Sequence, residues 1–351
     1  MSKEEIKKGR DELKSQYNIL WYHTTWHSGS FKILKKAFDF LWGMLLSLYL
    51  LFRYRVTMVY SEGFPGAIIG HYLSILSRKP HVVHTFEPHA DYMIEARVWS
   101  RESWEARFLK KMQGKVAKGA YAVLTATEAY ISQWRNEAPN TRFYRVPSCV
   151  DTDFFSFSEQ ERVYWRKQWG ITEQEVLLVY LGKIGGMYWE EELLDLYKTF
   201  CSSQKFTFRL VVISPQDSTV LPDIQSTNVI WLSGERKDIP GWLSACDLAI
   251  SAIRPIPSRR FSSPIKHGEY WAIGLPVIVP AGISDDYLLV EEKQIGYVLP
   301  SLDDKGYRKV LTEVEEKLDR HDAKRAVDFA TNDRDVKGYS LLYKDLFMNN
   351  L

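Results

Sequence analysis

The sequence predicts an α/β protein made of two doubly wound domains with parallel sheets. Short runs rich in β-branched and aromatic residues recur along the chain, and longer segments of helical character separate them. That alternation is typical of parallel strands joined by crossover helices. The chain has 351 residues, which is more than one hydrophobic core usually organises. Two domains of similar architecture are therefore expected.

Each domain is expected to contribute five strands. In the first domain they are residues 18–23, 57–62, 81–87, 122–127 and 142–147. In the second domain they are residues 176–182, 208–214, 228–234, 248–253 and 276–280.

The stretch VPSCVDTDFFSFSEQE separates the two sets of strands, and its proline, serines and aspartates interrupt any period. We place the domain boundary there, with residues 1–155 as the first domain and residues 156–334 as the second. Residues 335–351 have apolar positions at helical spacing. They are expected to form a closing helix that packs back on the first domain.

The composition excludes several classes of protein. Lysine and arginine (46 residues) barely exceed aspartate and glutamate (44), and the net charge of +2 argues against a general nucleic-acid-binding protein. The three cysteines lie far apart, so neither a disulfide framework nor a zinc site is expected. The first residues are charged and cannot serve as the apolar core of a secretory signal. We therefore expect a cytoplasmic protein.

The longest apolar run, FLWGMLLSLYLLF, covers residues 40–52. A helix of that length is about 20 Å long, well short of the roughly 30 Å hydrocarbon core of a bilayer, so it is not expected to span a membrane. We expect a buried helix between two strands. Lysines upstream and arginines downstream support a second interpretation, in which the helix also rests on the inner face of a membrane.

A glycine-rich loop, GKIGGMY, follows the first expected strand of the second domain. Ligands of open parallel sheets bind beyond the carboxyl ends of the strands. Glycines such as Gly185 let backbone amides approach a phosphate there, and Lys183 supplies positive charge. The spacing matches neither the GxxxxGK[ST] loop of ATPases nor the dinucleotide-binding GxGxxG. An ordinary strand-to-helix turn is the alternative interpretation.

A second anion-binding signal opens the helix in SSPIKHGEYWAIGLPVIVP. Ser263 is the expected N-cap and Pro264 the first helical residue. Lys266 then lies in the first turn, where the helix dipole favours an anion rather than a cation, and Glu269 follows on the same face. The pair is interpreted either as a lysine for phosphate beside a carboxylate for sugar hydroxyls, or as an intrahelical ion pair without a ligand.

Together, several stretches resemble the GT-B glycosyltransferases, especially the family-four group that uses nucleotide sugars. SSPIKHGEYWAIGLPVIVPAGISDD is similar to their donor-binding segment, and LVYLGKIGGMYWEEELLDL to the first strand and glycine loop of their donor domain. Their linker, usually VPNGVDTxxF, is similar to VPSCVDTDFF in this sequence. The last strand and helix of their acceptor domain resemble AYAVLTATEAYISQW, and the segment that passes the base resembles WLSGERKDIPGWLSACDLAIS. The resemblance implies two Rossmann-like domains that face a cleft, with the acceptor domain first and the donor domain second.

On the donor side, the resemblance implies roles for residues of this sequence. Glu269 matches the second glutamate of the family's E-x7-E motif, which holds the ribose hydroxyls. Lys183 stands where the family often has an arginine on the diphosphate, and Lys266 matches a lysine of the variant form SPxKxxE. Arg236 is expected near the base or its ribose. The backbone amides expected to face the sugar or its β-phosphate are those of Gly282 and Ile283.

One departure from the family pattern concerns the first glutamate of E-x7-E. The residue eight positions before Glu269 is Phe261, so the usual contact with the transferred sugar is missing. Ser262, Ser263 or a glutamate from the other domain is expected to compensate.

On the acceptor side, residues 84–95 read HTFEPHADYMIE and follow an expected central strand. Related enzymes have a histidine or carboxylate near this point, so Glu87 and His89 are the expected residues for acceptor alignment or proton acceptance. The alternative is that His89 and Asp91 only cap or brace the following helix. Gly29, after the first expected strand, would let acceptor or donor phosphates approach.

Residues 151–153 read DTD, which resembles the metal-binding motif of the other large glycosyltransferase fold. Here the motif lies in the interdomain linker, so turn and capping roles are expected. Neither a metal nor another cofactor is expected, because lysines and helix amides can stabilise the leaving diphosphate.

The main hypothesis is a GT-B glycosyltransferase of polysaccharide or glycoconjugate biosynthesis, for which the resemblance implies retention at the anomeric carbon. Its partners would be a nucleotide-sugar donor and a glycan or lipid-linked acceptor, with peripheral membrane contact and no nucleic acid. The second hypothesis is a non-catalytic or partner-dependent relative that binds a nucleotide sugar or glycan, motivated by Phe261. A nicotinamide-dependent dehydrogenase fits poorly, because neither first strand is followed by GxGxxG with an acidic residue about 20 positions later.

Overall fold

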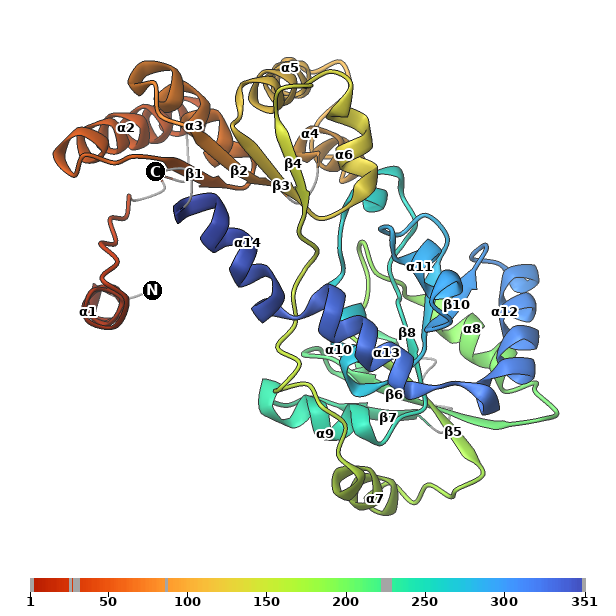
Figure 1. Cartoon of the computed structure of the whole chain (residues 1–351). Coiled ribbons are helices and arrows are strands. Elements are labelled where there is room, and N and C mark those ends of the chain that lie inside the picture. Colours follow the sequence, from red (N-terminus) through yellow and green to blue (C-terminus); the bar gives the residue numbers. More distant parts are fainter. Residues whose placement is uncertain (1–2, 25–26, 28–31, 86–87, 222–228, 349–351) are drawn as a thin grey trace.

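Two separate parallel sheets organise the chain (Figure 1). The computed structural model describes residues 3–24, 27, 32–85, 88–221 and 229–348. The first sheet has the order β1-β2-β3-β4. Its strands are β1 (Val59–Glu62), β2 (His81–Thr85), β3 (Ala122–Thr125) and β4 (Arg142–Arg145).

The second sheet has the order β10-β9-β8-β5-β6-β7. Its strands are β5 (Glu175–Leu181), β6 (Thr207–Ile213), β7 (Val229–Leu232), β8 (Leu248–Ile250), β9 (Val277–Pro280) and β10 (Gly296–Leu299). The chain winds outward from β5 through β6 to β7, returns to β8 and then winds the other way. The sheet is therefore doubly wound, and its topological switch point lies between β5 and β8. This architecture confirms the predicted fold class of an α/β protein with two parallel sheets.

Nine of the ten predicted strands are present as β1 to β9, and the prediction differs from the structure at two strands. The strand predicted at residues 18–23 is wrong, because this segment pairs with no strand in the described part of the chain, and Ile19, Leu20 and Tyr22 are exposed. β-Forming residues make a strand only where a neighbour supplies hydrogen bonds and packing. β10 is absent from the prediction, since the sequence GYVL is too short to show a period.

Helices flank both sheets. Those before the linker are α3 (Phe64–Ser77), α4 (His89–Glu95), α5 (Trp104–Gly119) and α6 (Glu128–Arg135). Those after it are α7 (Glu159–Gln168), α8 (Glu191–Phe200), α9 (Ile239–Ser244), α10 (Ile265–Ile273), α11 (Asp286–Glu292), α12 (Asp304–Lys317) and α13 (Ala323–Phe329). The shorter turns are η1 (Ser218–Val220), η3 (Arg236–Asp238), η4 (Pro257–Phe261), η5 (Leu318–Arg320) and the π-helical η6 (Ala330–Arg334). Many of these helices begin after an N-cap residue whose hydroxyl or carboxylate accepts a hydrogen bond from an amide of the first turn. Examples are Ser103, Thr127, Ser158 and Asp303.

The central strands of the second sheet are buried on both faces. Leu178 and Tyr180 of β5 belong to one hydrophobic cluster, which includes residues of α8 and α12. Leu177 and Val179 belong to the other cluster, which includes residues of α10. This alternation follows the two-residue period of a strand, and burial on both faces explains why β5 has a nearly continuous apolar sequence.

The chain crosses twice between the two sheets. Residues 146–158 run from β4 to α7, and Phe155 of this linker is fully buried in the core beside α10. The return crossing is at Asp335, whose backbone bridges to the linker. α14 (Val336–Met348) then packs against the first sheet through Leu346.

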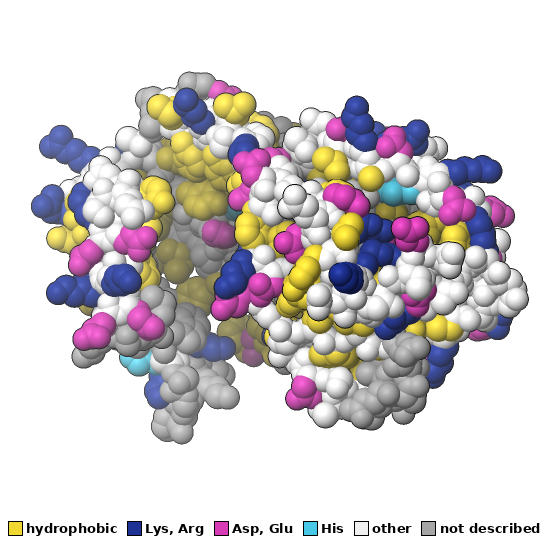
Figure 2. Space-filling view, turned by 90° about the horizontal axis from the view of Figure 1, so that it is seen from below, with side chains coloured by type: hydrophobic (Ala, Val, Ile, Leu, Met, Phe, Trp, Pro, Cys, Tyr) yellow, Lys and Arg dark blue, Asp and Glu magenta, His cyan; other side chains and the backbone are white. Residues whose placement is uncertain are grey.

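The helix expected to be buried between two strands is largely exposed. α1 (Lys3–Tyr17) stands apart from the body in Figure 1, and α2 (Lys32–Arg53) lies beside α3. α2 turns many large apolar side chains outward, so the prediction of a buried helix is wrong. α2 packs on α3, and the side of the helix that faces away from α3 is left uncovered by the described residues. Figure 2 shows hydrophobic side chains gathered in a hollow on the same, amino-terminal side of the molecule.

Across the described residues, no helix is both long enough and apolar enough to cross a bilayer.

Candidate functional site

The glycine loop after β5 lies at the switch point of the second sheet and is rigidly held. Gly185 has a φ of 91°, and a Cβ there would lie 2.3 Å from Glu190 Oε1, so glycine suits this turn. The side-chain amide of Gln216 accepts the Ile184 amide at 2.7 Å and donates back to the Ile184 carbonyl at 3.3 Å. Lys183 is exposed at the beginning of the loop. Its charge is therefore available to a ligand beyond the end of β5.

The loop pairs with the segment that follows β8, on the other side of the switch point. The Trp189 amide donates to the Ala252 carbonyl at 3.0 Å, and Tyr188 forms an isolated β-bridge with Ile253. The Trp189 indole also donates to the Ile253 carbonyl at 3.1 Å. The loop after β5 and the segment after β8, which border the predicted ligand crevice, are thus joined by hydrogen bonds along one side of it.

α10 begins one residue later than predicted, and Ser263 is not its N-cap. The helix runs from Ile265, with Pro264 at the N-cap position and no side-chain capping bond. The Ser263 hydroxyl instead accepts the Ser148 amide at 3.0 Å and a guanidinium N–H of Arg334 at 2.6 Å. The Ser263 hydroxyl is therefore occupied by donors from the linker and from η6. In the first turn of α10 the His267 amide donates to the Pro264 carbonyl at 3.2 Å, and the amides of Ile265 and Lys266 precede it at the helix N-terminus.

Lys266 and Glu269 form the ion pair that the sequence spacing allows. The Lys266 ammonium lies 2.9 Å from Glu269 Oε2, and the Glu269 side chain is only 2% exposed whereas that of Lys266 is 37% exposed. The Tyr270 hydroxyl accepts the Leu181 amide at 2.8 Å, which ties α10 to the end of β5. Four residues expected on the donor side therefore lie at the edge of the second sheet where its strands end: Lys183, Gly185, Lys266 and Glu269.

Gly282 also borders this edge, after β9. Its φ is 87°, and a Cβ there would meet no atom within 4 Å, so the backbone is open to an approaching ligand. The Ile283 amide donates to the Pro280 carbonyl at 3.2 Å, and the Ile283 side chain is fully buried. The Ile283 amide is therefore used to fix the turn, whereas the Gly282 amide has no acceptor among the described residues and can face a ligand.

Arg236 lies farther along the sheet, after the edge strand β7. Its guanidinium carbon is 5.5 Å and 5.4 Å from the ring centres of Phe154 and Phe155 in the linker. Stacking on these rings holds the arginine beside the crossing between the two halves. The structure therefore places Arg236 two strands away from the loop that contains Lys183.

Ser262 and Phe261 end the turn η4, which reaches into the first half of the molecule. The Ser262 hydroxyl donates to the Arg259 carbonyl at 2.9 Å. Phe261 is 8% exposed and belongs to the hydrophobic core beside α6, where its ring lies edge-on to Tyr130 at 6.0 Å. The Ser258 amide donates to the Glu95 carboxylate of α4 at 3.0 Å. The position expected to contact a sugar is thus an anchor between the two halves.

A chain of charges joins the same two halves. Asp286 is fully buried, accepts the His267 Nδ1–H at 2.7 Å and pairs with Arg334. Burial raises the pKa of Asp286, but the charge of Arg334 and the bond from His267 outweigh it, so the net pKa is lowered. Arg334 also lies 3.3 Å from Asp333, and Asp333 lies 2.9 Å from Arg145 of β4.

The last member of the chain is Asp285. It lies 3.3 Å from Arg145 and accepts the Glu128 amide at 2.7 Å, at the beginning of α6. A carboxylate at a helix N-terminus is favourable for both the free amides and the dipole. α10 and α11 are thereby fixed relative to the first sheet.

On the acceptor side, Glu87 and Gly29 lie outside the described residues. His89 begins α4, is partly buried, and has its ring 6.1 Å from that of Trp99. Burial lowers the pKa of His89, so its imidazole is neutral at neutral pH. Asp91 pairs with Lys110 of α5 at 2.6 Å, which is the bracing role that the sequence left open for it.

The DTD stretch forms a turn. Asp151 Oδ1 accepts the amides of Asp153 and Phe154 at 3.1 Å, as expected of a linker aspartate. In the described part of the chain no group of three or more histidine, cysteine, aspartate or glutamate side chains is arranged to hold a metal ion.

The sequence alone does not indicate the roles of three residues that hold the site in place: Gln216, Arg334 and Asp285. Gln216 follows β6, where an amide side chain has no motif, and its partner Ile184 is 32 residues away. Arg334 donates a hydrogen bond to Ser263, which is 71 positions away in the sequence. Asp285 accepts one from the Glu128 amide, which is 157 positions away. The available signal for Asp285 is its place after β9, at the ligand-binding edge of the sheet.

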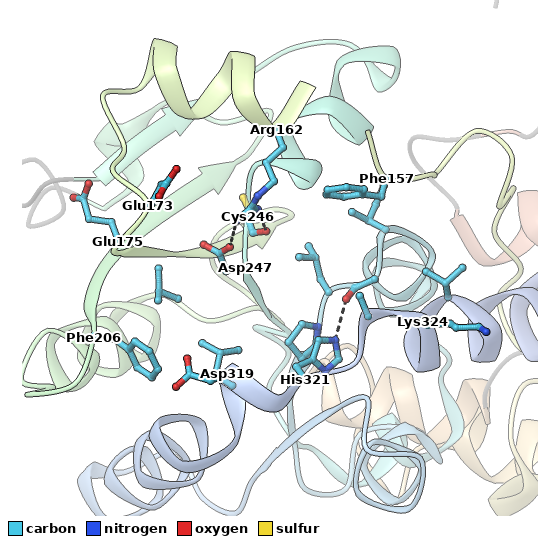
Figure 3. Close-up of a pocket in the computed structure, with 18 residues that line it drawn as sticks. Phe157, Arg162, Glu173, Glu175, Phe206, Cys246, Asp247, Asp319, His321 and Lys324 are labelled. Atoms are coloured by element: carbon cyan, nitrogen blue, oxygen red, sulfur yellow. Dashed lines mark hydrogen bonds and ion pairs between the residues drawn. The ribbon is translucent and has the colours of Figure 1, made fainter. Parts of the chain in front are cut away.

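A cavity of about 500 Å³ opens at the opposite edge of the second sheet (Figure 3). It is lined by residues at the amino ends of strands, including Glu175 and Asp247, and Arg162 closes one side through its 2.6 Å bond to Asp247. Because ligands of open parallel sheets bind at the carboxyl ends, this cavity is separate from the candidate site.

No protein-family model matches the chain, and no curated protein matches it either. Among solved structures, it is similar to Alr3699/HepE from Anabaena in complex with UDP, with a TM-score of 0.69 and 15% identity over 97% of this chain and 89% of that one. It is also similar to sucrose-phosphate synthase from Thermosynechococcus elongatus, with a TM-score of 0.67 and 12% identity over 92% and 80%. A third similar structure is WaaG, a glycosyltransferase involved in lipopolysaccharide biosynthesis, with a TM-score of 0.62 and 16% identity over 94% and 86%. The chain therefore has the GT-B fold.

Proposed function

We propose that the protein is a glycosyltransferase that moves a sugar from a nucleotide diphosphate sugar to an acceptor bound between its two halves. The observation that carries the proposal is the convergence of Lys183, Lys266 and the first turn of α10 at the switch point of the second sheet. A structure of Alr3699/HepE in complex with UDP-glucose supports the choice of donor.

In this proposal the donor diphosphate binds the free amides of α10 and the glycine loop, with Lys183 and Lys266 beside it. These cations and amides would stabilise the charge that develops on the leaving diphosphate. Glu269 would accept the ribose hydroxyls once Lys266 turns from it to the phosphate. No metal is needed for such a site, and we propose retention at the anomeric carbon.

The acceptor would bind on the side of α4. His89 is neutral at neutral pH because burial lowers its pKa, so it can accept a proton there. Glu87, which lies two positions before His89 in the sequence, would align the acceptor, and Gly29 would leave room for a phosphate. The proposed acceptor is a glycan or a lipid-linked saccharide in polysaccharide or glycoconjugate biosynthesis.

A second function, binding of a nucleotide sugar or glycan without turnover, is favoured by one observation. Phe261 replaces the family's sugar-contacting glutamate and is buried in the core beside α6. A site without that contact could hold the nucleotide but fail to orient the sugar.

A donor screen tests the two functions. UDP, GDP, ADP, CMP and their sugars are compared by thermal shift, and release of nucleotide from each sugar is measured with and without glycan acceptors. A ligand at 100 times its dissociation constant adds about 2.7 kcal/mol of stability. We expect one nucleotide diphosphate to stabilise the protein and its sugar to be turned over. Stabilisation without turnover would favour the binding function, and no stabilisation by any nucleotide would contradict both.

A further inference from the structure

The outward face of α2 carries a continuous apolar stripe. Its members recur at intervals of three or four residues, so they share one side of the helix. We call them the outer stripe, which consists of Leu34, Phe38, Leu41, Trp42, Leu45, Tyr49 and Phe52. Each is between 49% and 69% exposed. Monomeric proteins seldom leave such a contiguous apolar surface uncovered.

The inner face of α2 packs on α3 and is largely apolar too, with Leu51 buried and Met44 and Leu48 partly buried. Asp39 is buried there and accepts the His27 amide at 2.9 Å. A Cβ at Gly43 would lie 3.9 Å from the Ile69 side chain of α3, so Gly43 is on the side that faces α3, and Ser47 is partly buried. A surface helix normally turns its apolar side toward the core and its polar side to water. α2 is apolar on its outer side as well, and packing within the described part of the chain does not account for the outer stripe.

The charges around the outer stripe are almost all positive. Asp39 is the only acidic residue between positions 32 and 61, and it is buried. Lys36 near one end of α2 and Arg53 and Arg55 near the other end are exposed. α3, which packs beside α2, exposes Ile75 and Leu76 and ends beside the exposed Arg78. The exposed apolar surface therefore extends over a second helix and keeps its basic border.

We propose that the outer stripe of α2 docks in the interfacial region of an anionic lipid bilayer. The stripe supplies apolar area for the acyl boundary, and Trp42 and Tyr49 have the amphipathic rings that favour the headgroup level. The basic border matches anionic headgroups. Two copies of this chain would bring like charges together if they paired through the stripe, so a lipid surface fits better than self-association. This inference does not rest on the proposed transferase activity.

Vesicle co-sedimentation of the full chain tests the proposal. Vesicles of phosphatidylcholine alone are compared with vesicles that also contain phosphatidylglycerol. The apolar variant is Leu41→Ser with Leu45→Ser, and the charge variant is Lys36→Glu with Arg53→Glu. Leu341→Ser, at a 70% exposed leucine of α14, and Lys324→Glu, at an exposed lysine of α13, are the matched controls.

We expect wild type and both controls to bind the anionic vesicles, less so as salt is raised, and to bind neutral vesicles poorly. Each paired variant should bind at least about tenfold more weakly. Circular dichroism and thermal unfolding check that the variants fold, and the charge variant leaves the stripe itself intact. Absence of vesicle binding, or equal binding by wild type and both paired variants, would overturn the proposal. A wild-type dimer that becomes monomeric in the apolar variant would instead assign the stripe to contact between copies.

Discussion

Replacement of Arg334 by methionine is expected to lower the free energy of unfolding by roughly 3–5 kcal/mol. The Arg334 side chain is fully buried and pairs with Asp286, which is also fully buried. Without Arg334, the Asp286 carboxylate keeps only the bond from His267 in a site with no access to water. Removal of one member of a buried pair costs far more than removal of both, because an unpaired charge is left behind. Urea denaturation measures the effect.

Two comparisons make this prediction specific. Arg334→Met combined with Asp286→Asn should be more stable than Arg334→Met alone, because the double variant buries no unpaired charge. Arg308→Met breaks an ion pair with Asp304 whose members are 65% and 69% exposed, and it should change stability by less than about 1 kcal/mol. If Arg334→Met were as mild as Arg308→Met, the charge chain between the two halves would have no stabilising role.

Replacement of Phe261 by alanine is expected to cost about 3–5 kcal/mol, the usual range for a buried phenylalanine. Phe261 extends from η4 into the core beside α6, so its loss should loosen the contact between the two halves as well as the core. Phe261→Glu should be at least as destabilising, because it puts a charge into the same apolar site. Thermal unfolding and hydrogen exchange in α6 would report both effects.

The glutamate variant also separates two accounts of position 261. If the side chain faced the donor, Phe261→Glu would restore the family's sugar contact and raise turnover of a nucleotide sugar. The packing of Phe261 against Tyr130 instead predicts lower stability and no gain in turnover. Phe157→Glu, at a half-exposed phenylalanine of the linker region, should have little effect on either quantity.

Strong local patterns explain how much of the fold the sequence predicts. β1 to β9 follow runs of β-formers that also had neighbours to pair with, and Lys183 and Lys266 are recognisable because each follows a strand end or opens a helix. The segment at residues 18–23 has the same composition but no partner strand, and propensity alone cannot reveal that. The exposed side of α2 could not be predicted either, because the sequence period shows an apolar face without showing what it packs against.

The parts of the site that the sequence does not predict depend on distant contacts. Ser263 precedes a proline and so looks like an N-cap, but Ser148 and Arg334 bind its hydroxyl first. Phe261 can be recognised as a departure from the family pattern, but its burial beside Tyr130 requires the two halves to be in place. Such side chains are fixed by tertiary packing, which a local pattern does not contain.

The most direct test of the proposed donor site is calorimetric titration of the best nucleotide diphosphate into wild type and Lys266→Ala. A hydrogen bond to a charged group is worth roughly 1.5–3 kcal/mol, so Lys266→Ala should bind about tenfold to a hundredfold more weakly. The control is Lys309→Ala, which removes a helix-surface lysine 3.9 Å from Glu313 at the far side of the same half. We expect a loss of affinity for Lys266→Ala and none for Lys309→Ala. Equal affinity in all three proteins would mean that the Lys266–Glu269 pair is structural and that the donor, if any, binds elsewhere.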